Sequence, residues 1–468
     1  MLFNSLTFLV FFVIVFAVHR LIPGWYGKKL LLLVASYVFY AAWNPPYVAI
    51  LLFSTSLDWW LARLIWKSDS PGRRRLLLTL SLVANLSLLG FFKYGNFLLD
   101  NSRLLLGALG VHYAPPSLDI VLPIGISFYT FASLSYTIDV YRREIEGDAG
   151  YLDYALFVSF FPHLVAGPIV RARQLLPQFK MPRSVSRDQL GWGLTLVVIG
   201  LFTKTVLADS VFAPVVDAAY ANPAIGALES WAAVLGFSGQ IYCDFAGYSL
   251  CAIGLALSFG FEFPDNFRYP YAARGFADFW RRWHITLSSW LRDYLYVPLG
   301  GNRHGEVRTY LNLMLTMLIG GLWHGAAWTF VIWGGLHGAY LAVERGVRGV
   351  ARDTALPAAK DWIYTAVTFL MVTLTWIPFR AHDARTAGTV FSGLWRSVRP
   401  GQDAGALLLC YAAMGLLLVW QFMNRDLSLE ERFRRFSPTL QTALIGGCLV
   451  AMFLCSGGDE RAFIYFQF

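Results

Sequence analysis

Long apolar runs alternate with short polar loops along the whole chain. A helix of about 20 apolar residues crosses the ~30 Å hydrocarbon core of a bilayer. The pattern therefore predicts an all-α polytopic integral membrane protein. We expect 228–260 to be long enough to hold more than one element. The candidate spanning segments lie near residues 5–19, 29–43, 46–66, 75–98, 118–138, 152–168, 189–212, 228–260, 362–379, 404–423 and 440–456.

The composition supports this class. Of 468 residues 57% are hydrophobic and 14% are charged, whereas soluble domains carry about 25% charged residues. The first run, LTFLVFFVIVFAV, has no basic residue before it and no small-residue cleavage site after it. We therefore expect a retained helix rather than a signal peptide. We treat 1–468 as one integral membrane domain.

The net charge of +9 comes mostly from short loops, including 20–29, 67–75 and 139–150. Cytoplasmic loops of membrane proteins carry such an excess of Lys and Arg. This rule places these loops in the cytoplasm and the N-terminus on the outer side of the membrane, and we expect no nucleic-acid partner. The five cysteines form no CxxC pair, so we expect neither a disulfide framework nor a metal site.

Residues 262–308 are too polar to span the bilayer but are rich in aromatic side chains. Apolar residues recur at helical spacing, and charged residues occupy the other faces. This pattern predicts an amphipathic helix at the cytoplasmic interface, over about 272–300. The apolar positions are Phe279, Trp283, Leu287, Trp290 and Tyr294, and the charged ones are Arg281, Arg282, Arg292 and Asp293.

The stretch GGLWHGAAWTFVIWGGLHG follows within an apolar unit at 309–343. Its first 14 residues, 309–322, would form a helix of only ~21 Å, which is short of a full crossing. We therefore predict two half-helices or tilted helices with a break at His324, near the middle of the membrane. Irregular backbone at that depth needs protein or a water-filled cavity around it, so we expect His324 to line an internal cavity.

His324 and His284 are the candidate chemical residues among eight histidines. An imidazole with a pKa near ~6.5 in water can take and return a proton, and ionisable groups inside a membrane are often functional. A structural reading competes at both positions. His324 could bond to a backbone carbonyl freed by the glycine break, and His284 could be an ordinary interfacial residue. His337 lies 13 residues after His324 and suits close helix packing as much as chemistry.

Hydrolase, phosphate-loop, zinc-protease and Rossmann motifs do not occur in the sequence. Two histidines without a nearby carboxylate make a metal site unconvincing, and haem ligation prefers two histidines on facing long helices. The remaining chemistry is one imidazole acting on a bound hydroxyl or thioester.

The two histidine motifs carry a family resemblance. FWRRWHITLSSWLRDYLYVPLGGNR at 279–303, followed by the WHG stretch, resembles the membrane-bound O-acyltransferase superfamily. More narrowly it is similar to the bacterial branch that acetylates exopolysaccharides, typified by the alginate O-acetyltransferase membrane subunit. The stretches LPIGISFYTFASLSYTIDVYR, FPHLVAGPIVRARQLLPQF, YCDFAGYSLCAIGLALSFGFEFPDNFRYPY and the closing FIYFQF agree.

The resemblance implies a fold with roughly 11–13 membrane helices, some short or re-entrant, around a central tunnel in the bacterial inner membrane. It implies that His324 is the catalytic histidine and His284 the second signature histidine. The side chains expected along the substrate or donor tunnel are Trp323, Gly325, Trp283, Arg281 and Arg282. Relatives often carry an acid where this chain has Leu250, so that acid is no candidate here, although Asp244 remains nearby.

The implied function is transfer of acetyl groups across the membrane for O-acetylation of an exported polysaccharide, alginate or cellulose. The resemblance implies no bound cofactor, with acetyl-CoA or another acetyl thioester as donor substrate. Expected partners are the lipid bilayer, a periplasmic acetyltransferase of the SGNH type and a polysaccharide synthase complex.

Two alternatives remain open. One is acylation of peptidoglycan or teichoic acid by the same chemistry. The other is a transporter or flippase for a polysaccharide or a lipid-linked substrate. Transporters often show internal repeats, and the sequence has no second copy of the WHG or RRWH stretch.

Overall fold

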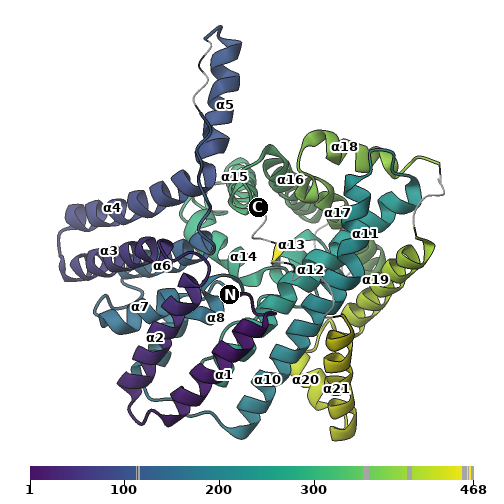
Figure 1. The fold of residues 1–468 in the computed structure, drawn as a ribbon. Helices are drawn as coiled ribbons and strands as arrows, with labels where there is room; N and C mark the ends of the chain where they lie inside the picture. Colours follow the sequence, from purple (N-terminus) through teal and green to yellow (C-terminus); the bar gives the residue numbers. More distant parts are fainter. Residues whose placement is uncertain are drawn as a thin grey trace. The chain divides into compact units, whose positions relative to one another are not determined.

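The computed structural model describes the chain except residues 112, 114–115, 351–357, 398–402, 456–460, 462 and 465–468. The regular elements of the described residues are all helical (Figure 1). The end of the FIYFQF motif, 465–468, lies outside the described residues. The chain forms two compact units. Unit 1 comprises Met1–Leu194 and Ala252–Pro264, and unit 2 comprises Thr195–Cys251 and Asp265–Phe468.

Seven helices within the described part of the chain are long and apolar enough to cross a membrane. This result confirms the prediction of an all-α polytopic membrane protein. The seven are Tyr47–Lys67, Pro71–Ala108, Arg187–Ala221, Ala227–Ser258, Asp361–Arg380, Ala404–Asn424 and Pro438–Cys455.

Unit 1 is built from the N-terminal helices. In order these are α1 (Leu6–Leu21), α2 (Trp25–Ala41), α3 (Tyr47–Lys67), α4 (Pro71–Leu89), η1 (Gly90–Tyr94), α5 (Gly95–Ala108), α6 (Ile126–Arg142), α7 (Tyr151–Ser159), α8 (Phe161–Leu164) and α9 (Ala172–Lys180).

A polar network is buried between α3 and α4. Asp58 accepts from Ser81 Oγ at 2.6 Å and from Asn85 Nδ2 at 2.8 Å. Ser54 donates to Asn85 at 2.8 Å, so the buried carboxylate is hydrogen-bonded.

The predicted span at 152–168 is wrong. The chain breaks at Phe160 into the short helices α7 and α8. Pro162 explains the break, because its ring would clash with the carbonyl four residues earlier if the helix continued, whereas a proline is tolerated in the first turn of α8.

The remaining helices belong to unit 2, except that residues 187–194 of α10 and 252–258 of α12 are part of unit 1. The first stretch runs from α10 (Arg187–Phe202) through η2 (Thr203–Phe212) and α11 (Ala213–Ala221) into α12 (Ala227–Ser258). α12 is one continuous helix of 32 residues, so the second element considered for 228–260 does not occur. The later elements are η3 (Pro270–Ala272), α13 (Phe276–Arg282), α14 (Ile285–Leu291), η4 (Arg292–Tyr296), α15 (Glu306–His324), α16 (Trp328–Val350), α17 (Ala358–Arg380), α18 (Ala384–Gly393), α19 (Ala404–Asn424), α20 (Leu429–Arg434) and α21 (Pro438–Cys455).

The single amphipathic helix expected over 272–300 is also wrong. α13 ends at Arg282 and α14 begins at Ile285, with His284 between them in the left-handed region at φ 41°. The five apolar positions of the predicted stripe are nevertheless all buried. The periodicity identified the buried residues but not the turn that interrupts the helix.

α15 and α16 form the predicted broken unit and pack against each other. α15 ends at His324, where the sequence placed the break. It begins at Glu306, so its 19 residues span ~28 Å. The alternative of a half-length helix is therefore wrong, and the alternative of a tilted helix stays a prediction. The two helices cross at glycines. A Cβ on Gly321 would lie 2.3 Å from the Phe330 carbonyl oxygen, and one on Gly334 would lie 2.3 Å from that of Met317.

Candidate active site

His284 is fully buried between α13 and α14 and is held by Asn266. Its Nδ1 lies 3.0 Å from Asn266 Oδ1. The same oxygen accepts from the hydroxyl of Thr286 at 2.8 Å and from its backbone N–H at 3.4 Å. Asn266 Nδ2 donates to Ser249 Oγ at 3.0 Å. These contacts orient the amide, so the oxygen faces the imidazole.

This orientation selects one tautomer of His284. Because Asn266 Oδ1 is an acceptor, His284 Nδ1 carries the hydrogen and Nε2 carries the lone pair. His284 Nε2 is buried and has no hydrogen-bond partner among the described residues. Burial lowers the pKa of the imidazole to about 3, so the ring is neutral at physiological pH. The site therefore contains a neutral imidazole with an available acceptor nitrogen.

His324 lies beside this imidazole. It is the last residue of α15, and its ring centroid is 6.5 Å from that of His284. Both side chains are buried. The structure thus brings together two histidines that are 40 positions apart in the sequence.

Aromatic side chains enclose His324. The ring centroids of Trp323 and Trp333 each lie 5.0 Å from it, and that of Phe379 lies 5.5 Å away. Phe245 packs against His284 at 4.6 Å. The walls around both imidazoles are therefore largely apolar.

Gly325 provides the close approach that the break requires. Its backbone is extended, at φ −157°, and a Cβ there would lie 2.0 Å from the ring of Phe330. Phe330 in turn contacts Phe379, which contacts His324. Gly325 is thus part of the packing behind the imidazole.

His337 lies on α16 and contacts the aromatic wall rather than the pair of imidazoles. Its Nε2 is 3.1 Å from the hydroxyl of Thr375, and its ring lies 4.7 Å from that of Trp333. Trp283 is fully buried, stacks on Phe279 at 5.6 Å and contacts Trp376 at 5.0 Å. These contacts are those of packing residues.

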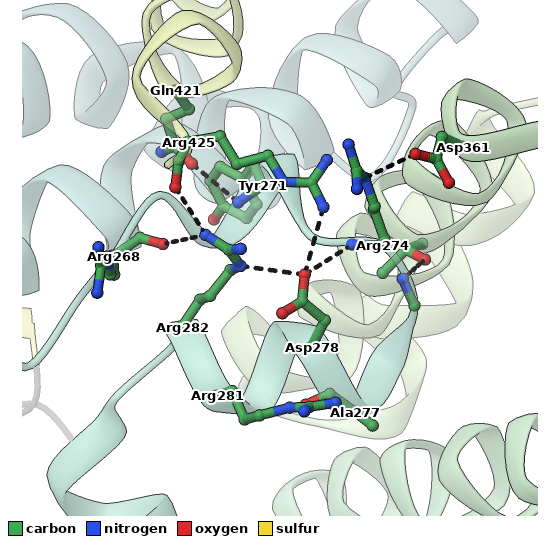
Figure 2. Close-up of polar contacts among 12 residues, drawn as sticks. Arg268, Tyr271, Arg274, Ala277, Asp278, Arg281, Arg282, Asp361, Gln421 and Arg425 are labelled. Carbon is green, nitrogen blue, oxygen red and sulfur yellow. Dashed lines mark hydrogen bonds and ion pairs between the residues drawn. The ribbon is translucent and has the colours of Figure 1, made fainter. Parts of the chain in front are cut away.

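The three arginines of the predicted amphipathic segment do not lie together. Arg281 is exposed, and its Nε donates to the carbonyl of Ala277 in its own helix at 3.2 Å. Arg292 bonds to its neighbour Asp293 at 2.7 Å. Arg282 instead belongs to a cluster with Arg274 and Arg425 (Figure 2).

Asp244 has a structural partner. Its carboxylate pairs with Lys204 of η2 and accepts the backbone N–H of Ile464 at 2.8 Å. Lys204 also pairs with Asp209 at 2.8 Å. Sequence reasoning missed Lys204, Asn266, Arg274 and Arg425, because each acts through a partner that is distant in the chain.

The helical fold and its long apolar helices define a polytopic membrane protein. The chain belongs to the membrane-bound O-acyltransferase family, whose model matches residues 73–378. It is therefore an O-acyltransferase that uses an acyl donor.

Two O-acetyltransferases of bacteria match this chain over most of its length, and a D-alanyltransferase matches about half of it. It is 41% identical to the probable alginate O-acetylase AlgI of Pseudomonas aeruginosa, over 91% of this chain and 83% of the relative. It is 39% identical to the peptidoglycan O-acetyltransferase of Helicobacter pylori, over 84% of this chain and 80% of that protein. The teichoic acid D-alanyltransferase of Bacillus subtilis is 27% identical, over 48% of this chain and 59% of its own length.

Proposed function

We propose that this enzyme transfers acetyl groups from a cytoplasmic acetyl thioester, such as acetyl-CoA, toward an exported polysaccharide. The observation that carries the proposal is the buried pair His284 and His324, whose ring centroids are 6.5 Å apart. The similarity to alginate O-acetylases over nearly the full chain favours alginate, or a related exopolysaccharide such as cellulose, as the final acceptor.

The proposed reaction is acyl transfer with His324 as the general base. His324 takes the proton of the acceptor hydroxyl while the hydroxyl oxygen bonds to the carbonyl carbon of the thioester. The C–S bond then breaks, and the thiolate recovers the proton from the imidazolium. Such proton transfer contributes typically ~10²–10⁴ in rate.

Two further groups can support this chemistry. His284 Nε2 can accept a hydrogen bond from a bound substrate, because Asn266 holds the imidazole in the tautomer that leaves this nitrogen unprotonated. Trp333 Nε1 is buried without a hydrogen-bond partner among the described residues and can donate to the carbonyl oxygen. A donor aimed at that oxygen stabilises the negative charge that develops on it.

The proposed setting is the bacterial inner membrane, with the N-terminus in the periplasm and the donor entering from the cytoplasm. The acceptor hydroxyl enters from the other side. It belongs to the polymer itself or to a serine of a periplasmic SGNH-type acetyltransferase, which works beside a polysaccharide synthase complex.

Peptidoglycan is the second candidate acceptor, because a peptidoglycan O-acetyltransferase shares 39% identity with this chain. The acceptor is identified by chemical analysis of the cell envelope and the secreted polymer in a strain that lacks the gene. Loss of acetyl groups from secreted polysaccharide supports the proposal. Loss from peptidoglycan alone would assign the second candidate.

The role of His324 is tested in that strain by complementation. We expect His324→Ala protein at normal abundance to restore less than about 1% of the acetylation given by the wild type, in line with the loss of a general base. His304→Ala is the control, because His304 is exposed in a loop, and it should restore acetylation fully. Full acetylation with His324→Ala would refute the assignment.

A further inference from the structure

The side chains of Arg282 and Arg425 meet at the carboxylate of Asp278, and Arg274 lies beside them (Figure 2). Asp278 of α13 lies 3.0 Å from Arg282 Nε and 3.6 Å from Arg425 Nη2. Its carboxylate also accepts the backbone N–H of Arg274 at 2.9 Å. The Arg274 side chain turns to Asp361, at 3.1 Å.

The cluster keeps an excess of positive charge in a partly buried place. The side chains of Arg282 and Arg425 are 15% and 7% exposed, whereas that of Arg274 is 51% exposed. Arg425 Nε is buried and has no hydrogen-bond partner among the described residues. Burial, together with the charges of Arg274 and Arg282, lowers the pKa of Arg425. Two largely buried guanidinium groups thus share the carboxylate of Asp278. A further anion would reduce the cost of burying the second positive charge.

Backbone hydrogen bonds tie the cluster to His284. The N–H of Arg268 donates to the carbonyl of Arg282 at 2.9 Å, and the N–H of Ile285 donates to that of Asn266 at 2.9 Å. Residues 266–268 therefore run beside 282–285, with the amide that holds His284 at one end. At the other end the Arg268 carbonyl accepts from Arg282 Nη1 at 3.3 Å. Arg282 and His284 are separated in the chain by Trp283 alone.

The side chain of Arg282 is fixed in this position. Besides Asp278, it donates to the carbonyl of Arg425 at 3.0 Å, and Arg425 follows the last residue of α19. Arg274 is the exposed member, Arg282 is held between two chain segments, and Arg425 is the most buried member. The cluster is thus open on the side of Arg274 and closed behind Arg425.

We propose that Arg274, Arg282 and Arg425 form a binding site for the phosphate groups of the acyl donor, close to the imidazoles that act on its thioester. This inference rests on the proposed function. Guanidinium groups suit it because each presents several N–H donors in a planar fork that matches phosphate oxygens. Without ligand, Asp278 pairs with Arg282 and Arg425, and Asp361 pairs with the side chain of Arg274.

Binding of free coenzyme A to the purified full-length protein in nanodiscs tests the site without acyl chemistry. We expect Arg425→Gln and Arg274→Gln each to weaken binding by roughly ten-fold, the scale of a lost charge-assisted hydrogen bond. Arg292→Gln is the matched control on the same segment, because this side chain is exposed and pairs with its neighbour Asp293, and it should bind within about two-fold of the wild type. The affinity should fall as salt is added.

Asp278→Asn separates ligand binding from a folding defect. This change adds one positive charge to the cluster, so coenzyme A should bind more tightly although the protein without ligand unfolds at a lower temperature. A merely structural cluster would give weaker binding in every variant that is less stable. Arg274→Gln gives a second variant in which a folding defect is not expected, because the side chain of Arg274 is half-exposed.

A lipid headgroup is the other source of a phosphate. Nanodiscs of phosphatidylcholine with and without phosphatidylglycerol distinguish the two. If phosphatidylglycerol alone stabilises the wild type but not Arg425→Gln, and coenzyme A does not bind, the site belongs to lipid and the donor assignment is wrong. Equal coenzyme A affinity in the wild type, Arg274→Gln and Arg425→Gln would also overturn it.

A failure of the proposed function can be distinguished from a failure of the phosphate site. His324→Ala should bind coenzyme A as the wild type does but transfer no acetyl group. If the wild type transfers no acetyl group from any thioester while the arginine variants still lose coenzyme A binding, the phosphate site stands and the proposed reaction does not.

Discussion

At the scale of single residues, Asn266 decides what His284 can do. One amide oxygen accepts from His284 Nδ1 and from both donors of Thr286. His284 and His324 could be predicted, because each belongs to a contiguous sequence motif that resembles a family. Asn266 could not, because it is 18 positions from His284 and meets it only through the pairing of two backbone segments.

Asn266→Asp should change the pH profile of acyl transfer. In the wild type the pKa of His284 is about 3, so this imidazole stays neutral throughout the range from pH 5 to 8. A carboxylate beside Nδ1 stabilises the imidazolium and raises this pKa. Protonated His284 has no acceptor nitrogen, so we expect kcat/KM of the variant to fall on the acid side at a higher pH than that of the wild type.

Measuring kcat/KM from pH 5 to 8 tests this expectation. Asn266→Ala should lower kcat by roughly ten-fold or more, because it leaves a buried N–H of His284 without an acceptor, a loss of about 1–3 kcal/mol. Ser249→Ala is the control, since it removes only the partner of the amide Nδ2. Identical pH profiles for the wild type and Asn266→Asp would show that Asn266 does not control the proton on His284.

At the scale of elements, hydropathy predicts where long helices lie but not where a helix is interrupted. The apolar stripe of 272–300 continues at helical spacing through Trp283, and only the left-handed backbone of His284 divides it. The break at His324 was visible because glycines accompany it. Gly321 and Gly334 fix the crossing of α15 and α16, because at these positions the backbones of the two helices are in direct contact.

Gly321→Ala and Gly334→Ala should therefore separate these helices. Each added Cβ would lie 2.3 Å from a carbonyl oxygen of the partner helix, and backbone cannot move aside as a side chain can. Overpacking of this kind typically costs about 1–3 kcal/mol. Because α15 ends at His324, we also expect a loss of acyl transfer larger than the loss of folded protein.

Thermal unfolding in detergent and acetyl transfer per folded molecule measure the two effects. Gly335→Ala on α16 is the matched control, since its Cβ would meet only Leu318, at an ordinary 3.5 Å. If all three variants behave alike, the close crossing does not position His324.

At the scale of the whole chain, distant segments meet at one buried carboxylate. Asp244 of α12 pairs with Lys204 and accepts the N–H of Ile464, which is 220 positions away. Phe463 then packs against Phe245 at 5.3 Å, and Phe245 lies against His284. No local pattern predicts such a contact, because an ion pair is specified by the packing of complete helices.

Lys204→Met should destabilise the fold and weaken the site together. It leaves the buried charge of Asp244 unpaired, and breaking one partner of a buried pair typically costs about 3–5 kcal/mol. The isolated carboxylate can then no longer hold residues 463–464 against α12 with the same geometry. We expect a lower unfolding temperature in detergent and reduced acetyl transfer.

Lys204→Met combined with Asp244→Asn isolates the charge, because the amide oxygen can still accept the N–H of Ile464 after the carboxylate is removed. The double variant should recover part of the stability that Lys204→Met loses, and a similar part of the transfer activity. A double variant that is less stable than Lys204→Met would show that the pair contributes through packing and not through charge. Recovery of stability without activity would show that the contact between Phe463 and Phe245 does not support His284.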